Sequence, residues 1–214
     1  MGIKERKERE KEHRRRTILK AAKKLIGRYG VDGMSMNQLA ESTELNKATL
    51  YLYFSNKDDL IDAIVFEALI RLEKLFQEVV ARSLNGLDTI MLISDSMFDF
   101  YRKYSVYFYA MNHQERRNAA ERMETPYSVK GNEKAAALFQ ILSDCIDKGI
   151  AEGSIREGID TRSFLMLFFA HIYGVMHTIN SKADVYEDVL NLDAASIERS
   201  ARKMIAYYLK NIPI

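Results

Sequence analysis

The 214-residue sequence contains few of the residues that interrupt or cross-link a chain. It has two prolines, Pro126 and Pro213, and one cysteine, Cys145, which cannot form a disulfide within the chain. Cys145 lies in "LSDCIDKG" with no histidine or second cysteine beside it. We therefore expect its thiol to fill a small space in the core rather than bind a metal or carry out redox chemistry.

Long membrane-spanning and secretory patterns are also lacking. No run of eighteen or more uncharged apolar residues occurs, and the beginning, "MGIKERKEREKEHRRR", has no apolar centre of the kind a secretory signal contains. A hydrophobic fraction of 47% is nevertheless enough to fill a core. The sequence predicts a folded cytoplasmic protein with no membrane partner.

The patterns that mark enzymes are missing as well. There is no glycine-rich phosphate loop, no nucleophile with a base at motif spacing and no pair of acids that stands out. The four histidines are scattered, and even His171 and His177 are six residues apart, whereas zinc ligands on one helix face are four apart. We expect no catalytic activity, no metal site and no cofactor.

Apolar residues recur at steps of three and four along the whole chain, which predicts an all-α protein of about nine helices. The first helix should end at about residue 29, with Gly30 as a left-handed cap. Ser35, Asn46 and Ser55 are expected to be the N-caps of the next three helices, and the fourth should run to about residue 83. Later helices are expected over residues 88–103, 105–120, 128–152, 161–180 and 194–211.

Charge is distributed unevenly. Residues 1–57 contain fourteen Lys and Arg against seven Asp and Glu, a net charge of +7, whereas residues 58–214 contain eighteen against twenty-three, a net charge of −5. Residues 4–12 mix both signs and are explained by a solvated helix, but residues 14–28 contain seven arginines and lysines with no acid. Such a surface is expected to meet phosphates.

The stretch "SMNQLAESTELNKATLYLYFSNKDDL", residues 35–60, has the layout of a helix-turn-helix, with two short helices joined by a turn. It also resembles the TetR family of bacterial transcriptional repressors in residue order and spacing. The matching residues are Gly30, Gly33, Ser35, Leu39, Ala40, Asn46, Lys47, Thr49, Leu50, Tyr51, Tyr53, Phe54, Lys57 and Leu60. Glu44 departs from the pattern, because the family often has glycine in this turn, and it would be strained at a positive φ.

The resemblance implies an N-terminal three-helix DNA-binding domain, residues 1–57, followed by a helical ligand-binding and dimerisation domain, residues 58–214. It further implies a repressor that binds a palindromic operator in double-stranded DNA as a homodimer.

Within the motif, the first turn of the recognition helix is expected to read bases and its flanks to hold phosphates. The structural alternative is that Thr49 and Tyr51 only pack against the first helix, and Leu50 and Phe54 are expected to be core. The predicted DNA contacts are Ser35, Asn46, Lys47, Ala48, Thr49, Tyr51, Tyr53 and Lys57.

The helix over residues 161–180 is apolar nearly all the way round, so it should be covered on two sides. The last helix offers an apolar stripe, and in the family these two helices pair with their copies in a four-helix bundle. The predicted interface residues are Leu165, Phe169, Ile172, Met176, Ile197, Ala201, Ile205 and Tyr208.

Residues 96–111, "SMFDFYRKYSVYFYAM", are dense in aromatic side chains. These rings either fill the bundle or line a cavity for a small, largely apolar or aromatic effector. The candidate pocket residues are Phe66, Phe76, Phe98, Tyr101, Tyr104, Phe108, His113 and His171. A DNA-bound scaffold that recruits a protein and has no small-molecule effector remains the alternative.

Overall fold

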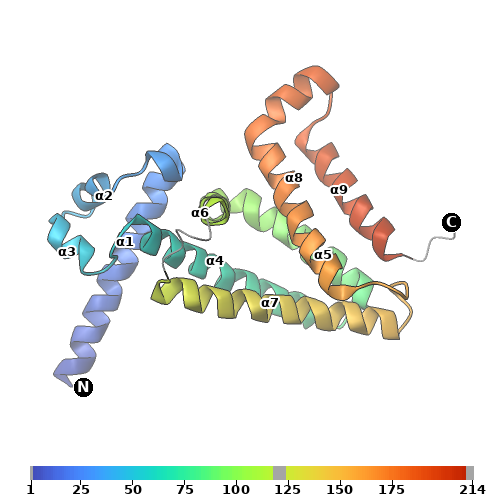
Figure 1. The fold of residues 1–214 in the computed structure, drawn as a ribbon, viewed down its shortest axis with the longest axis horizontal. Helices are drawn as coiled ribbons and strands as arrows, with labels where there is room; N and C mark the ends of the chain where they lie inside the picture. Colours follow the sequence, from blue (N-terminus) through green and yellow to red (C-terminus); the bar gives the residue numbers. More distant parts are fainter. Residues whose placement is uncertain (1, 118–123, 211–214) are drawn as a thin grey trace. The chain divides into compact units, whose positions relative to one another are not determined.

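The computed structural model describes residues 2–117 and 124–210. These residues form nine helices and no strand, so the all-α prediction is confirmed (Figure 1). The helices are α1 (Ile3–Gly33), α2 (Met36–Ser42), α3 (Lys47–Tyr51), α4 (Lys57–Val80), α5 (Gly86–Lys103), α6 (Ser105–Arg116), α7 (Pro126–Ala151), α8 (Thr161–Leu190) and α9 (Ala194–Leu209).

Two compact units make up the chain. Unit 1 comprises Met1–Leu69 and Tyr104–Lys134, and unit 2 comprises Ile70–Lys103 and Ala135–Ile214. Unit 1 therefore contains the helix-turn-helix together with α6 and the beginning of α7, and so extends beyond the predicted 1–57 segment.

Helix α1 packs into unit 1 through its middle. Ile18, Ala22 and Ile26 are fully buried, as the apolar stripe predicts, whereas Tyr29 at the end of that stripe is 45% exposed. The predicted break at Gly30 is present, with φ 71° and ψ 172°. The positive φ is as expected, but the ψ value lies outside the left-handed helical region, and one more turn follows to Gly33 before the chain leaves α1.

The N-caps of α2 and α3 are the residues that the sequence predicted, whereas the N-cap of α4 is not. The Ser35 side chain accepts from the Gln38 amide, and the Asn46 side chain accepts from the Thr49 amide. The prediction of Ser55 as a cap is wrong by one residue, because Asn56 Oδ1 accepts from the Asp59 amide at 2.8 Å. Ser55 instead donates its amide and hydroxyl to Asp59 Oδ2, so the acid that folds back on the preceding turn is Asp59, not Asp58, which lies three residues after Ser55.

Several later helices differ from the predicted bounds. Helix α8 continues ten residues beyond residue 180 to Leu190, and its C-cap Asn191 has a left-handed φ of 52°. Helix α6 ends at Arg116, and residues 118–120 and 211, which the sequence assigned to helices, lie outside the described residues.

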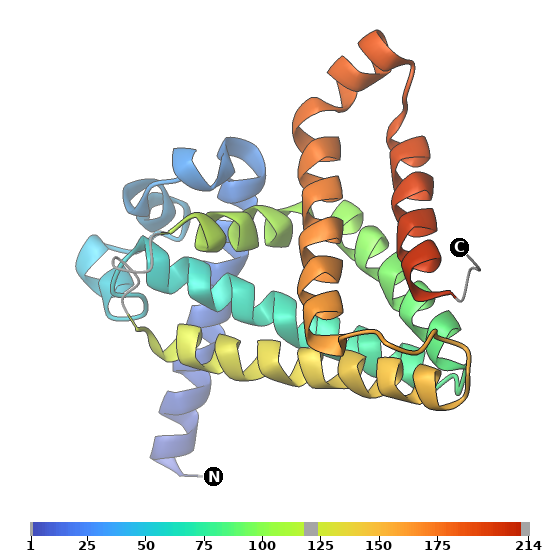
Figure 2. The ribbon, with the colours of Figure 1, turned by 45° about the vertical axis from the view of Figure 1, so that its right-hand side comes forward.

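Unit 2 is built around α8 and α9, which lie side by side in both ribbon views (Figures 1 and 2). Ion pairs join α5 to α9, with Arg102 on Glu198 and Arg202 on Asp95. Elsewhere in this unit Gly86 approaches α7 so closely that a Cβ on it would lie 2.3 Å from the Gly149 Cα, which excludes any larger residue.

One segment of α8, Thr161–Ser181, is long and apolar enough to cross a membrane on length and composition alone. Only 28% of it is buried within the chain. A helix that is covered by a second protein subunit has the same composition, so this finding bears on the homodimer proposed below.

Candidate nucleic-acid interface

A tight turn connects α2 to α3. The Leu45 amide donates to the Ala40 carbonyl at 3.0 Å, and the Thr43 hydroxyl donates to the Leu39 carbonyl at 2.7 Å, so the end of α2 is closed by its own chain. Glu44 has a φ of 54°, the left-handed conformation that the sequence identified as costly for this residue. Its exposed side chain lines a shallow groove that also includes Lys47.

Helix α3 has an inner and an outer face. Leu50 is fully buried, as is Phe54 just beyond the helix, so both are core as predicted. Lys47, Ala48 and Tyr51 are exposed and Thr49 is half-buried. The residues expected to read bases are therefore on the accessible side of a short helix, although their contact with DNA stays a prediction.

The residues expected to hold phosphates differ in their burial and in the contacts that they already make within the chain. The Ser35 hydroxyl already donates to Gln38 Oε1 and accepts from the Gln38 amide, so its hydrogen-bonding capacity serves the cap. Lys57 Nζ lies 3.4 Å from the Asp32 carbonyl oxygen. Tyr53 is half-buried and follows α3 rather than belonging to it, because α3 ends at Tyr51.

Arg15 supports the segment after α3, a role that no sequence pattern indicated. Its Nη2 donates to the Tyr53 carbonyl at 3.3 Å, and its guanidinium lies 5.5 Å from the Phe54 ring centroid and 5.3 Å from that of Tyr127.

Two other features of this region were not predicted from the sequence. The spacing of Ser35 and Gln38 is that of a capping box and was visible in the sequence, whereas no pattern marked Leu52, which is 80% exposed.

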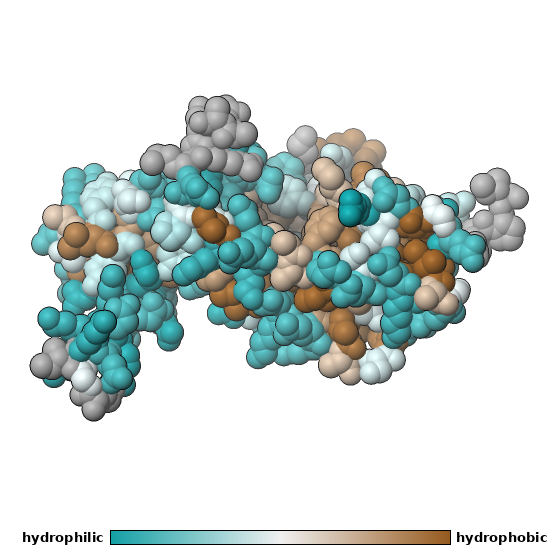
Figure 3. Space-filling view, turned by 60° about the horizontal axis from the view of Figure 1, so that its bottom comes forward, coloured by the Kyte–Doolittle hydropathy of each residue, from teal (hydrophilic) through white to brown (hydrophobic). Residues whose placement is uncertain are grey.

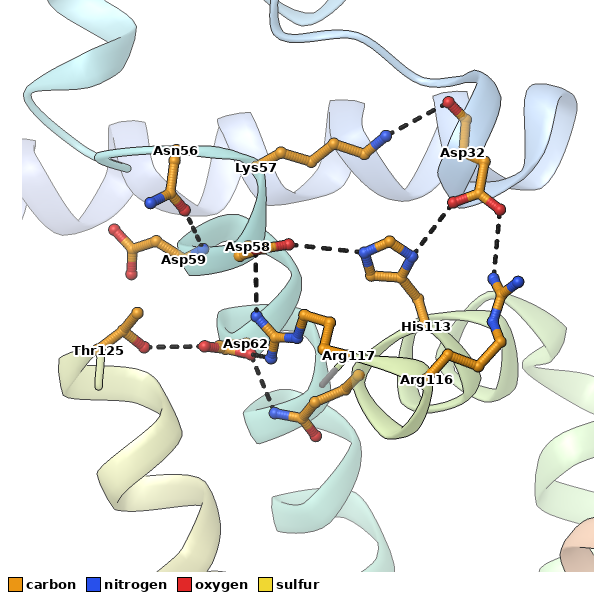
Figure 4. A network of polar contacts seen from close by, with 11 residues as sticks. Asp32, Asn56, Lys57, Asp58, Asp59, Asp62, His113, Arg116, Arg117 and Thr125 are labelled. Atoms are coloured by element: carbon orange, nitrogen blue, oxygen red, sulfur yellow. Dashed lines mark hydrogen bonds and ion pairs between the residues drawn. The ribbon is translucent and has the colours of Figure 1, made fainter. Parts of the chain in front are cut away.

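A polar network holds the end of α1 and the beginning of α4 against α6 (Figure 4). The His113 ring lies between two carboxylates, with Nδ1 3.2 Å from Asp32 and Nε2 3.5 Å from Asp58. Arg116 donates to the other oxygen of Asp32 at 3.2 Å and thereby lowers the pKa of that carboxyl. These contacts fix the elements on both sides of the helix-turn-helix.

Asp62 is the buried centre of the same network. Its side chain has no exposed surface and accepts from Arg117, from Gln114 Nε2 at 2.9 Å and from Thr125 Oγ1 at 3.0 Å (Figure 4). A buried carboxylate needs such a set of donors, because an unpaired one would be strongly destabilising.

The predicted pocket residues are distributed over both units. Phe66, Tyr104, Phe108 and His113 belong to unit 1, and Phe76, Phe98, Tyr101 and His171 to unit 2. Both histidines are engaged elsewhere: His113 in the carboxylate network, and His171 through Nε2 at 3.1 Å from the Ala201 carbonyl on α9.

The six aromatic residues of the set differ in burial. Phe76, Phe98, Tyr101 and Phe108 are at most 3% exposed, and burial raises the pKa of the Tyr101 hydroxyl. Phe66 and Tyr104 are half-buried. Whether any of them contacts a ligand stays a prediction.

Most of the predicted interface residues turn inward. Leu165, Ile172, Met176, Ala201 and Ile205 are at most 5% exposed, because α8 and α9 pack on each other and on α5 within unit 2. Phe169 and Ile197 are half-buried, and Tyr208 is 42% exposed. The most exposed large apolar side chains at the beginning of α8 and in α9 are others, namely Met166, Leu167, Met204 and Tyr207.

Groups that could serve another chemistry are few in the part of the chain that the structure describes. It contains no cluster of three or more His, Cys, Asp or Glu side chains that could hold a metal ion. Burial raises the pKa of the Cys145 thiol, which is only 7% exposed, so this cysteine has the character of core filler.

Comparison with known proteins agrees with this geometry. Residues 18–64 match the model of the family described as bacterial regulatory proteins, tetR family. The fatty acid metabolism regulator protein of Bacillus subtilis is 23% identical over 155 residues, which cover 72% of this chain and 77% of that protein. The class D tetracycline repressor of Escherichia coli is 35% identical over 57 residues, 27% of this chain and 26% of the repressor.

Two solved structures have the same fold. The regulator FadR from Bacillus subtilis, in complex with stearoyl-CoA, superposes with a TM-score of 0.68 at 20% identity over 90% of this chain and 97% of that one. AibR, in complex with isovaleryl coenzyme A and operator DNA, gives a TM-score of 0.63 at 20% identity with the same coverage. Residues 18–64 therefore carry the helix-turn-helix of the TetR family of transcriptional regulators, a non-enzymatic family, and the chain has the fold of these two solved regulators.

Proposed function

We propose that this regulator is a cytoplasmic repressor that binds a palindromic operator as a homodimer and leaves it when an acyl-CoA thioester binds. The observation that carries the DNA-binding part is the outer face of α3, where Lys47, Ala48 and Tyr51 are exposed while Leu50 anchors the helix in the core. Residues 1–57 remain the proposed DNA-binding segment, and residues 58–214 the proposed ligand-binding and dimerisation segment.

Base reading is assigned to the first turn of α3. Lys47 can reach guanine acceptors, and Ala48 or the Thr49 methyl can contact a thymine methyl. Lys47→Ala should change which operators are preferred, each base contact being worth about 1–3 kcal/mol, whereas Tyr53→Phe should weaken all operators alike. Binding to an operator panel measures this, and a uniform loss for Lys47→Ala would remove it from base reading.

Dimerisation is assigned to the outward faces of α8 and α9. Met166, Leu167, Met204 and Tyr207 are 63–73% exposed, and Gly174 on the same side of α8 has open space around it. Apolar patches of this kind are costly in water unless they are covered. A second copy is the proposed cover, since two recognition helices related by a two-fold axis can read successive turns of a palindrome. A dimer would also explain why the Thr161–Ser181 segment is apolar and poorly buried within the chain, so no membrane is needed to cover it.

The ligand class rests on the relatives. FadR is solved with stearoyl-CoA and AibR with isovaleryl coenzyme A, and the similarity to the Bacillus subtilis fatty acid regulator extends well beyond the helix-turn-helix. A largely apolar acyl chain also suits the buried aromatic residues of unit 2, such as Phe76 and Phe98.

The ligand proposal is tested by thermal shift and operator release with stearoyl-CoA, isovaleryl-CoA, free coenzyme A and an unrelated aromatic compound. A ligand at one hundred times its Kd stabilises the folded state by about 2.7 kcal/mol. We expect at least one thioester to raise Tm and to release DNA, and free coenzyme A to do neither. If no compound changes Tm or operator affinity, the scaffold that recruits a protein partner becomes the better account.

A further inference from the structure

The first four turns of α1 form a charged segment that belongs to no packing surface of unit 1. Every side chain from Lys4 to Arg14 is exposed, and burial begins at Arg15 and Ile18. The family match starts only at residue 18, so this segment precedes the part of the chain that the helix-turn-helix accounts for. Figure 3 shows hydrophilic residues gathered over it.

The charges on this segment are sorted by face. Arg6 pairs with Glu10 at 3.0 Å and Arg16 pairs with Glu12 at 3.1 Å, each one turn away on the helix. Glu5 accepts from the Gly2 amide at 3.0 Å. Three of the four acids are thus matched by neighbouring groups, and the fourth, Glu8, lies at helical spacing from Lys4 and Lys11 without forming an ion pair with either.

A second row of basic residues has no such partners. Lys4, Lys7, Lys11 and Arg14 are spaced by three and four residues, so they lie in one row along the helix. Ile18, four residues after Arg14, continues the same row and faces the core of unit 1. Among the described residues, none of these four basic side chains forms an ion pair with an acid. We call Lys4, Lys7, Lys11 and Arg14 the basic row.

The basic row starts beside the recognition helix. Arg15, the next residue after Arg14, donates to the Tyr53 carbonyl and stacks on Phe54, directly after α3. From there to residue 3 the helix is about 20 Å long at 1.5 Å per residue. Double-stranded DNA carries one phosphate per about 1.7 Å of axis, so a row of that length spans several phosphates.

We propose that the basic row binds the phosphates of DNA that flanks the operator half-site, on the side of α3 from which α1 projects. This inference rests on DNA binding by the helix-turn-helix and lengthens the bound DNA beyond the base pairs that α3 reads. Charge complementarity and continuity with Arg15 favour DNA over an acidic protein or an anionic membrane as the occupant. The contact adds affinity and salt dependence without sequence preference.

The test compares two double variants on two DNA fragments. Lys7→Gln with Lys11→Gln removes two charges from the basic row, and the matched control Arg6→Gln with Arg9→Gln removes two charges of the same segment that lie outside the row. Gln and Lys have similar helix propensity, so circular dichroism should show little change in helix content. One DNA fragment ends at the outer edge of the half-sites, and the other continues for about ten base pairs on each side.

We expect the wild-type protein to bind the long fragment more tightly than the short one, and K7Q/K11Q to lose that difference. Removing two phosphate contacts from each protomer should reduce the slope of log affinity against log salt by about 1.8 per protomer. Between 50 and 200 mM salt this corresponds to roughly a tenfold change in relative affinity for each protomer. The R6Q/R9Q control should keep the preference for long DNA, and K7R/K11R should keep it as well.

Equal losses in K7Q/K11Q and R6Q/R9Q would overturn the proposal, because only general charge would then matter. So would a wild-type protein that binds short and long DNA equally. Binding of the wild type to the short fragment is the separate test of the helix-turn-helix, so failure of the basic row and failure of operator binding are distinguishable. Lys7-dependent and Lys11-dependent binding to anionic vesicles, with no effect of flanking DNA, would assign the row to a membrane surface instead.

Discussion

The buried pair of Asp62 and Arg117 provides the strongest test of how unit 1 is held together. Replacing Arg117 with methionine keeps most of the side-chain volume but removes the cation from a carboxylate that has no exposed surface. Breaking a buried pair by removing one partner typically destabilises a protein by about 3–5 kcal/mol. Gln114 and Thr125 still donate to Asp62, so we expect about 3 kcal/mol, the lower end of that range.

Two further variants, Asp62→Asn alone and the double variant, complete the measurement. Asp62→Asn with Arg117→Met removes both charges and should cost clearly less than Arg117→Met alone, because no unpaired buried charge remains. For a protein of this size, 1 kcal/mol corresponds to a Tm change of about 2–4 °C, so Arg117→Met should lower Tm by roughly 6–12 °C. Urea unfolding at fixed protein concentration gives the free energies directly. A loss below about 1 kcal/mol for Arg117→Met, or a double variant as unstable as the sum of the single ones, would refute the reasoning.

The remaining predictions concern strain, pH and assembly. Glu44→Gly should stabilise the protein by about 0.5–1 kcal/mol because it relieves a left-handed φ, whereas Glu44→Gln should not, and urea unfolding distinguishes the two. The Asp32 carboxyl has a lowered pKa because Arg116 donates to it, so its stabilising contribution is present above its ordinary pKa of 3.8 and is lost as the pH falls through the folded value. The stability difference between wild type and Asp32→Asn should therefore shrink in acid, and a difference that grows below about pH 4 would contradict the assignment. Leu167→Glu should yield monomers in analytical ultracentrifugation, whereas Val80→Glu, at an exposed apolar position elsewhere in unit 2, should leave dimers intact.

Helix periodicity made most of the fold predictable, since with two prolines little interrupts the apolar spacing. The caps at Ser35 and Asn46 and the break at Gly30 follow from residue types that favour those conformations. The cap at Asn56 was missed because Ser55 and Asn56 are adjacent and both suit the position. Residues 181–190, "SKADVYEDVL", extend α8, and the prediction stopped short although Val185 and Val189, like Tyr186 and Leu190, are spaced by one helical turn.

Side-chain orientation in the second half of the chain was harder to predict. Helix α8 is apolar nearly all the way round, so the sequence could not tell Leu165 and Ile172, which are buried in the chain, from Met166 and Leu167, which are exposed. The placement of His113 between two carboxylates depends on contacts between α1, α4 and α6 that are distant in sequence. The outer face of α3 was predictable, because a five-residue helix with Leu50 inward leaves few alternatives.

The most direct test of the central claim is selection of bound DNA from a random pool by the full-length protein, repeated with Lys47→Ala. A dimeric regulator that reads bases through α3 should enrich a palindrome whose half-sites are centred about one helical turn, or a multiple of it, apart. The Lys47→Ala protein should enrich a motif that differs within each half-site. Recovery of no motif by the wild-type protein, or of the same motif with unchanged base preferences by Lys47→Ala, would contradict the account.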